Sequence, residues 1–327
     1  MNELALASFA AANDSHLVGE PRSARVASFK AGFDAAAELE RLTRLGFRFL
    51  ARSDPGFPPL LRAIHDPPPG LFVRGEEEIA VLARPAVAIV GARACSAYGR
   101  QIARSLGREL AAAGLVVVSG LARGVDSEAH RGALEASGKT VAVLGCGIDR
   151  DYPAANRELA RQVAATGLVV SEYAPGVEPA PWRFPARNRI VAGLCGATVV
   201  VEARERSGAL ITADFALEEG REVFAVPGEI TSALSAGSNA LLRLGATPLT
   251  CAQDVLESFG LAAMEPAAPE LGPAATAVRE RVREGAVGAD ELARATGLGA
   301  GELAAILTEL ELAGKVSQEE GVYRACG

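Results

Sequence analysis

Residues 85–99 read PAVAIVGARACSAYG, and this stretch decides the fold class. Four apolar residues, 87–90, are followed at once by a glycine turn and by a segment that can start a helix. The apolar residues are continuous rather than alternating with polar ones, which indicates a strand buried on both faces. Strands of this kind are typical of a parallel sheet that helices cover on both sides.

The same pattern recurs along the middle of the chain. Short apolar runs occupy residues 87–90, 115–118, 141–144, 168–170, 198–201 and 223–226. Helix-like segments lie between most of them, at 99–113, 127–136, 156–165 and 212–219. This alternation of strand and helix predicts a doubly wound α/β domain with a mostly parallel sheet.

The regions on either side of this domain have a different character. Before it, we expect a helix over residues 34–45, with Asp34 as its N-cap and Gly46 as its stop, and a short strand at 47–50. The proline-rich residues 55–69 are predicted to form an extended connector outside the core. After it, a low-complexity linker covers residues 262–272.

The C-terminal segment has the pattern of a winged helix. Three helix-sized segments, 276–284, 290–295 and 301–313, precede a hairpin over 315–325 that turns at Gly321. We therefore expect an N-terminal helical region with a connector (1–75), the α/β domain (76–260), a linker (261–273) and a winged-helix domain (274–327).

Charge and cysteine content limit the classes of function. The 327 residues include 33 basic and 40 acidic ones, and the net charge of −7 by itself argues against a nucleic-acid partner. Residues 84–260 nevertheless hold 18 basic and 18 acidic residues, so the positions of the arginines matter more than the total charge.

The five cysteines are scattered without a C-x-x-C pair, so we expect free thiols and predict no metal and no cofactor. With no basic N-terminal region and no apolar run of roughly 18 residues, we predict a cytoplasmic protein without a membrane partner.

The segments after the strands carry the candidate site, because ligands of open α/β sheets bind at the carboxyl ends of the strands. After the first strand, Gly91 permits close backbone approach, Arg93 can donate two hydrogen bonds to a phosphate, and Ser96 can cap a helix or bind a phosphate oxygen. After the second strand, Arg123 lies between two glycines, and Asp126 with Ser127 is predicted to cap the next helix.

Two further segments add arginines and helix starts. Residues 182–193 read WRFPARNRIVAG, with three arginines, no acidic residue, and a tryptophan and a phenylalanine interleaved. Arginine for phosphates and aromatic faces for bases are what single-stranded nucleic-acid binding requires. Ser207, Gly208 and Thr212 precede or begin a helix, which is favourable for an anion. We therefore expect a basic row at one sheet edge, formed by Arg93, Arg123, Arg187, Arg189 and Arg206.

Two acidic residues at strand ends leave two interpretations open. Glu172 and Glu202 could hold a Mg²⁺ ion together, or they could orient the neighbouring arginines and loop amides; the second is preferred. His130 is predicted to be structural.

These motifs resemble the DNA processing protein A family, also called Smf. The segments VGARACSAYG, SGLARGVDSEAHRGAL, GKTVAVLGCGIDRDYPAAN, FPARNRIVAGL and EARERSGALITADFALEEGREVFAVPG carry the resemblance. It implies an extended Rossmann-like domain that binds single-stranded DNA without catalysis, protects incoming strands in natural transformation, helps to load the RecA recombinase and forms a homodimer. It also implies a partial SAM-like N-terminal region. The positions that match the DNA-gripping motifs are Gly91, Arg93, Ser96, Arg123, Asn156, Arg187, Asn188, Arg189, Ser207, Gly208 and Thr212.

The sequence lacks the motifs expected of three other classes of protein. A nucleotide-processing hydrolase of the lysine-decarboxylase-like type would carry P-G-G-x-G-T-x-x-E, whereas residues 227–229 read PGE. A nicotinamide-dependent dehydrogenase would need the motif G-x-G-x-x-G, which this sequence lacks. A protein-interaction module would not explain an arginine at so many strand ends.

Residues 301–313 carry Glu302, Glu309 and Glu311 and no basic residue, so we predict that the winged helix makes protein contacts rather than reading duplex DNA. Weak DNA contact through Lys315 or Arg324 is left open.

Overall fold

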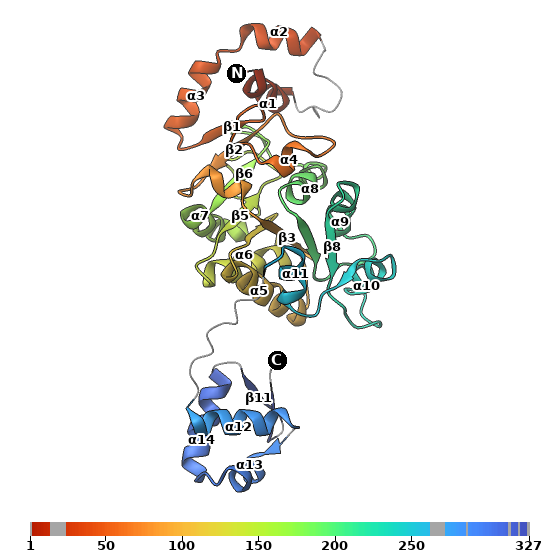
Figure 1. The fold of residues 1–327 in the computed structure, drawn as a ribbon. Helices are drawn as coiled ribbons and strands as arrows, with labels where there is room; N and C mark the ends of the chain where they lie inside the picture. Colours follow the sequence, from red (N-terminus) through yellow and green to blue (C-terminus); the bar gives the residue numbers. More distant parts are fainter. Residues whose placement is uncertain are drawn as a thin grey trace. The chain divides into compact units, whose positions relative to one another are not determined.

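The computed structural model describes residues 2–13, 24–261, 272–285, 287–312, 315–319 and 321–325 (Figure 1). The chain divides into two compact units, Met1–Ala263 and Met264–Gly327. The expected linker over 262–272 lies outside the described residues except for Gly272. In the described part of the chain, no helix combines the length and apolar character needed to cross a membrane.

The larger unit is built on a nine-stranded sheet with the order β1-β2-β6-β5-β4-β3-β7-β8-β9. From β6 to β9 all neighbouring pairs are parallel, and β1 and β2 add an antiparallel edge. The predicted doubly wound, mostly parallel fold is therefore confirmed. The strands are β1 (Arg48–Ala51), β2 (Gly70–Arg74), β3 (Ala86–Val90), β4 (Val116–Ser119), β5 (Thr140–Val143), β6 (Leu168–Ser171), β7 (Ala197–Val200), β8 (Glu222–Ala225) and β9 (Thr247–Pro248).

The continuous apolar runs bury both faces of the sheet, as expected for parallel strands. In β3, Ala88 and Val90 face one cluster of buried residues, while Val87 and Ile89 face another. Helices cover both sides. The first cluster packs against α4 (Pro59–Arg62), α8 (Arg183–Gly193), α9 (Gly208–Glu218) and α10 (Ala236–Arg243); the second packs against α5 (Ala97–Ala112), α6 (Val125–Glu135) and α11 (Ala252–Ser258).

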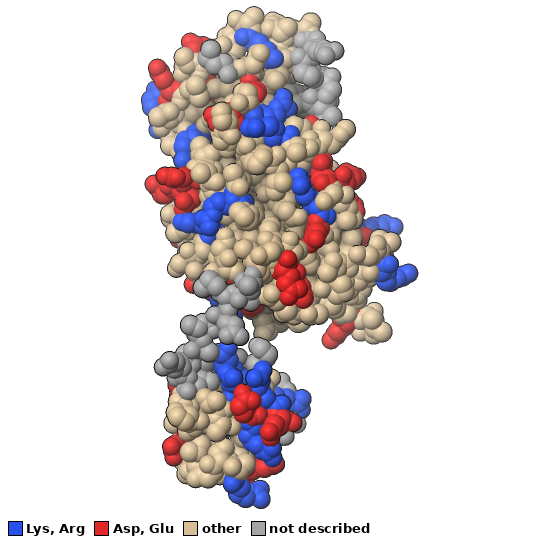
Figure 2. Space-filling view, in the orientation of Figure 1, with Lys and Arg blue, Asp and Glu red and all other residues tan. Residues whose placement is uncertain are grey.

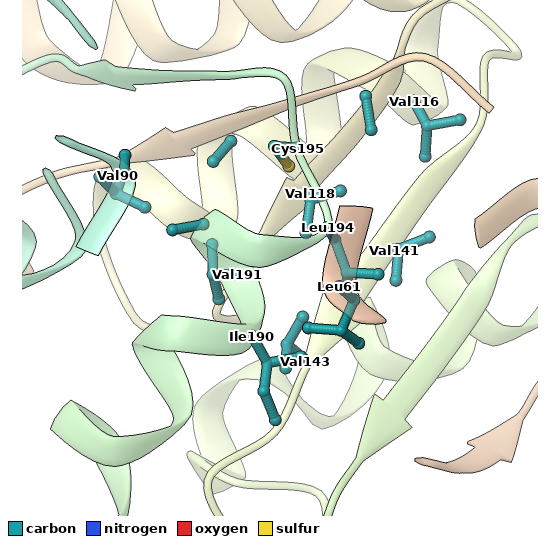
Figure 3. Packing of buried hydrophobic residues seen from close by; sticks show 14 of the residues in the cluster. Leu61, Val90, Val116, Val118, Val141, Val143, Ile190, Val191, Leu194 and Cys195 are labelled. Atoms are coloured by element: carbon teal, nitrogen blue, oxygen red, sulfur yellow. The ribbon is translucent and has the colours of Figure 1, made fainter. Parts of the chain in front are cut away.

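The proline-rich residues 55–69 were predicted to lie outside the core, and this was wrong. Phe57, Leu61 and Ile64 are at most 5% exposed, and the short helix α4 packs against α8. Figure 3 shows Leu61 close to Ile190 of α8, to Leu194 just after α8, and to Val141 and Val143 of β5. Leu61 belongs to α4, Phe57 and Ile64 lie just before and just after it, and Pro59 occupies the first turn of the helix, where it is tolerated.

Helices at the N-terminal side cover the edge formed by β1 and β2. The helix α3 (Ala35–Arg44) begins as predicted, since the Asp34 carboxylate accepts from the amides of Ala36 and Ala37, both at 3.0 Å. The helix α1 (Asn2–Asn13) buries Leu4 in the same cluster as Leu42 of α3. The helix α2 (Ala24–Gly32) precedes α3, and α7 (Arg157–Thr166) packs in the same cluster over β5 and β6.

The smaller unit is a winged helix, as the sequence pattern predicts. Three helices, α12 (Pro273–Arg283), α13 (Ala289–Thr296) and α14 (Ala300–Leu312), enclose a core that includes Val278, Leu292 and Leu307. A three-stranded sheet of order β10-β12-β11 completes the unit; β10 (Val287–Gly288) lies between α12 and α13, and β11 (Val316–Glu319) and β12 (Val322–Ala325) follow α14. Glu302, Glu309 and Glu311 are exposed on α14.

Candidate functional site

The fold has a topological switch point between the adjacent strands β3 and β7. The chain leaves β3 through α5 on one face of the sheet and leaves β7 through α9 on the other face. Loops that diverge in this way open a crevice at the carboxyl ends of the strands, where open α/β sheets bind ligands. A pocket of about 200 Å³ lies there.

The pocket is lined by four segments that are far apart in the sequence. They follow β3, follow β4, belong to α8, and begin α9. Seven of the predicted site residues meet in it, namely Gly91, Arg93, Arg187, Asn188, Ser207, Gly208 and Thr212. The remaining four, Ser96, Arg123, Asn156 and Arg189, are not among its lining residues.

The loop after β3 is held at both ends by one acidic residue at the end of β7. The main-chain oxygen of Glu202 accepts from the Ala92 amide at 2.7 Å. Its carboxylate accepts from the amide of Ser96 at 2.9 Å and from the Ser96 hydroxyl at 2.5 Å. The Ser96 hydroxyl also caps α5 by accepting from the Gly99 amide at 3.0 Å. Glu202 therefore orients loop amides, the second of the two roles left open by the sequence.

Two buried residues of opposite charge, Arg187 and Asp126, line the pocket and contact Gly120. Arg187, 4% exposed, donates to the main-chain oxygen of Gly120 at 2.9 Å. Asp126 accepts from the amides of Gly120 at 3.0 Å and Ala122 at 3.3 Å. Burial raises the pKa of Asp126, while the charge of Arg187 and the amide hydrogen bonds oppose this rise. A side chain at position 120 would collide with both charged groups, so this position requires glycine.

Asp126 was predicted to cap the following helix together with Ser127, and this was wrong. The helix α6 begins at Val125 after Gly124, whose φ of +77° is readily adopted only by glycine. Asp126 therefore lies inside the first turn and points back to the preceding loop. The Ser127 hydroxyl likewise donates to the Ala122 oxygen at 2.6 Å.

The start of α9 forms the opposite wall of the pocket. Ser207 caps this helix by accepting from the Ala209 amide at 3.3 Å, and Asn188 donates to the Gly208 oxygen at 3.1 Å. Gly208 is exposed, and Thr212 is almost fully buried one turn further on. The first amides of an α-helix lack intrahelical acceptors and favour a negative charge.

The rim of the pocket combines a guanidinium with two aromatic rings. Arg93 is exposed, and its guanidinium lies 5.5 Å from the ring centroid of Phe184. The ring of Tyr152 stacks on Phe184, with centroids 5.2 Å apart and planes inclined by 23°. Trp182 lies edge-on to Tyr173 and under the guanidinium of Arg183 at 4.8 Å.

Of the other predicted residues, Asn156 stabilises the loop after β4 instead of lining the pocket. It is 5% exposed, and its amide donates to the Leu121 oxygen at 2.8 Å and to the Ser127 hydroxyl at 3.0 Å. Leu121 has a φ of +59°, which is unusual for a residue other than glycine. Asn156 therefore fixes the loop after β4 in a strained conformation, and Arg123 is exposed on that loop.

Arg189 is engaged by acidic residues of the protein itself. Its guanidinium donates to both oxygens of Glu172, at 2.8 and 2.7 Å, and to Asp66 at 3.0 Å. Burial alone would lower the pKa of Arg189, but the carboxylate of Glu172 outweighs it and raises that pKa. Glu172 thus orients an arginine, again the preferred of the two roles. Within the described residues, no cluster of three His, Cys, Asp or Glu side chains could hold a metal ion.

The row of five arginines expected at this edge is therefore divided in two. Arg187 and Arg189 bind protein groups, whereas Arg93, Arg123 and Arg206 are exposed and form no ion pair with a described carboxylate. Figure 2 shows basic and acidic side chains interspersed over the drawn face of the larger unit. An anion is therefore attracted to this unit by individual exposed arginines and not by the net charge of the unit.

The sequences of both units match models of a known protein family. A sequence profile described as DNA recombination-mediator protein A matches residues 48–260, and a profile of the DprA winged helix domain matches residues 262–322. The chain belongs to the DNA recombination-mediator protein A family. The DNA processing protein DprA of Streptococcus pneumoniae is 48% identical over 210 residues, which are 63% of this chain and 72% of that protein. The putative DNA processing protein DprA of Mycobacterium tuberculosis is 40% identical over 310 residues, 89% of this chain and 80% of the relative.

Solved structures of this family share the fold. The X-ray structure of DNA processing protein A from S. pneumoniae has a TM-score of 0.68 at 40% identity, and the match covers 79% of this chain and 93% of that chain. The structure from Helicobacter pylori, described as giving insights into the single-stranded DNA binding mode of that protein, has a TM-score of 0.59 at 32% identity and covers 65% of this chain and 95% of that chain.

Sequence reasoning missed two features of the site. It did not identify the stacking of Tyr152 on Phe184, because the two residues are 32 positions apart and only Phe184 belongs to the arginine-rich, aromatic segment 182–193. It also missed the contacts of Asp126 and Arg187 with Gly120. The available signal was an acidic residue six positions after a strand-end glycine, which is equally typical of a helix cap.

Proposed function

We propose that this protein binds single-stranded DNA at the switch-point pocket and through the exposed arginines Arg93, Arg123 and Arg206. The observation that carries the proposal is that seven predicted DNA-contacting residues, from three of the pocket's four segments, line one pocket with the exposed Arg93 on it. The family membership and the single-stranded DNA described for the H. pylori relative support it.

The size and chemistry of the pocket favour part of a polymer over a whole small molecule. Its volume of about 200 Å³ is below the roughly 300–1,000 Å³ of small-molecule sites. The first amides of α9 and the guanidinium of Arg93 are donors suited to one phosphate. The rings of Phe184 and Tyr152 beside it are suited to bases, which stack without regard to sequence.

The role in the cell follows from the family rather than from the pocket. We propose that the protein protects incoming single strands in natural transformation and helps to load the RecA recombinase onto them, as a homodimer. The loading role is tested by measuring RecA ATPase on oligonucleotides coated with single-strand-binding protein. Addition of this protein should shorten the lag. An unchanged lag would remove the loading role while leaving DNA binding untouched.

We propose a binding role without catalysis. The two carboxylates at the strand ends near the site are engaged, Glu172 by Arg189 and Glu202 by Ser96, so neither is positioned as a free base. Nucleotide hydrolysis that copurifies with the protein and is lost in Glu172→Ala would favour a nucleotide-processing hydrolase instead.

The decisive experiment compares single-stranded and duplex oligonucleotides by fluorescence anisotropy over a range of salt concentrations. We expect tighter binding of the single strand. If the three exposed arginines each contact one phosphate, the slope of log K against log salt should be about −2, at about −0.7 per phosphate. Equal affinity for duplex, or affinity independent of salt, would contradict the proposal.

A further inference from the structure

Beside the pocket, the ring of Tyr152 presents an aromatic surface to solvent. The residue is 42% exposed, although a large aromatic ring is usually covered. One side of it is occupied by Phe184, at a centroid distance of 5.2 Å and an angle of 23°. Phe184 in turn lines the pocket and lies under the guanidinium of Arg93.

This order leaves Tyr152 as the accessible end of a stack. The ring of Phe184 already contacts both Arg93 and Tyr152, and Phe184 is less exposed than Tyr152. A base that approaches along the rim therefore meets the ring of Tyr152, whose plane is fixed by the ring beneath it.

The backbone on both sides of Tyr152 is anchored. On one side, Asp151 forms an ion pair with Arg74 of β2 at 2.8 Å. On the other side, the buried Asn156 binds Leu121 and Ser127. A ring held in place loses little conformational freedom when a base stacks on it, so more of the stacking energy appears as affinity.

A cation lies close to Tyr152 along the chain. Arg157 is exposed at the first position of α7, five residues after Tyr152, and forms no ion pair with a described carboxylate. The segment thus offers an aromatic face and a phosphate donor within one short stretch, the combination found in single-strand binding sites.

We propose that Tyr152 is a base-stacking subsite for a nucleotide next to the one whose phosphate occupies the switch-point pocket. This inference rests on the proposed single-stranded DNA binding and extends it to a specific base contact. The subsite accepts any base, because stacking uses the π-face that all bases share.

The test combines Tyr152→Ala with single abasic sites placed at successive positions of a short oligonucleotide. Removal of one stacked base is expected to weaken binding roughly 5- to 140-fold, from the range of about 1–3 kcal/mol known for base–aromatic contacts. Tyr152→Ala should show this loss on intact DNA with an unchanged salt slope, because no phosphate contact is removed. At one abasic position the wild type should lose the same factor, and Tyr152→Ala should lose nothing further.

Two variants separate stacking from folding. Tyr152→Phe should restore affinity to within about twofold of the wild type, because the ring is retained. Tyr152→Leu keeps an apolar side chain on Phe184 but should bind as weakly as Tyr152→Ala. Thermal unfolding establishes that each variant is folded. If Tyr152→Ala does not fold, the comparison of Tyr152→Leu with Tyr152→Phe on intact and abasic DNA decides the question.

The outcomes distinguish this subsite from the proposed function itself. If the wild type does not bind single-stranded DNA, the proposed function fails. If the wild type binds but Tyr152→Ala and Tyr152→Leu bind equally well, or if the abasic effect is the same in all variants at every position, the subsite is overturned while DNA binding stands.

Discussion

Ser96 donates both its main-chain amide and its hydroxyl to the two carboxylate oxygens of Glu202, at 2.9 and 2.5 Å. The main chain of Glu202 also accepts from Ala92 at 2.7 Å. One residue at the end of β7 thus fixes both ends of the loop that presents Arg93. Glu202 is 3% exposed, so solvent cannot easily replace these contacts.

Replacement of Glu202 should disturb this loop. Glu202→Ala leaves the amide and hydroxyl of Ser96 without their acceptor, and we expect the free energy of unfolding to fall by about 1–3 kcal/mol. Single-stranded DNA binding should weaken as well, because Arg93 is no longer held at the rim. Glu202→Gln retains one acceptor oxygen and should give intermediate values. Denaturant titration and anisotropy measure the two effects; wild-type affinity in a folded Glu202→Ala would contradict this role.

Arg93 should contribute a phosphate contact. We expect Arg93→Ala to weaken binding of all single-stranded sequences alike and to make the salt slope shallower by about 0.7, the value for one phosphate. The matched control is Arg104→Ala on α5, because Arg104 is 46% exposed but pairs with Glu135 and Glu128. Equal losses in the two variants, or an unchanged slope in Arg93→Ala, would count against the assignment.

Arg189 should support the fold rather than contact DNA. Its side chain is 13% exposed and that of Glu172 is 10% exposed, so Arg189→Ala leaves a buried carboxylate uncompensated. Loss of one partner of a buried ion pair costs about 3–5 kcal/mol of stability. We expect a large drop in melting temperature but, where the variant is folded, an unchanged salt slope. A stable Arg189→Ala with a shallower slope would show instead that Arg189 binds phosphate.

The sheet could be predicted from the sequence because burial on both faces leaves a continuous apolar run, a signal contained within each strand. The position of the site followed from it, since all strand ends of a parallel sheet meet at one edge. The burial of residues 55–69 in the core could not be predicted in this way. Six of these fifteen residues are prolines, which indicates an irregular segment, and the burial of Phe57, Leu61 and Ile64 depends on contacts with distant elements such as α8.

The different roles of Arg187 and Arg189 were also beyond the sequence. They lie two residues apart on α8, so they point to different sides of the helix. Arg187 reaches Gly120 in the pocket, whereas Arg189 reaches Asp66, which is 123 positions earlier in the chain. The acidic partner that separates a structural arginine from a binding one is supplied by tertiary packing, which the local motif does not encode.

His130 is held neutral inside the larger unit. It is fully buried, and its Nδ1 lies 2.7 Å from the hydroxyl of Thr140. Thr140 donates its only hydroxyl proton to the Val117 oxygen at 2.7 Å, so Nδ1 of His130 must carry the proton and donate. Burial lowers the pKa of His130 to about 3, and the charges of Arg187 and Arg131 act in the same direction.

Stability should therefore fall on acidification below pH 6.5, the ordinary pKa of a histidine. Between pH 6.5 and about 3 the unfolded chain binds a proton at this position and the native protein does not. The free energy of unfolding should thus decrease by up to about 1.4 kcal/mol per pH unit as the pH falls through this window, and the contribution of His130 to stability should be fully present above it.

The variant His130→Asn tests this pH dependence. Its amide nitrogen can replace Nδ1 as the donor to Thr140 and does not titrate. The variant should be less stable at pH 7.5 because of the lost volume, but its stability should depend less steeply on pH between 6.5 and 5. Denaturant titrations of both proteins across this range measure the difference in slope, and parallel curves would show that His130 does not cause the acid sensitivity.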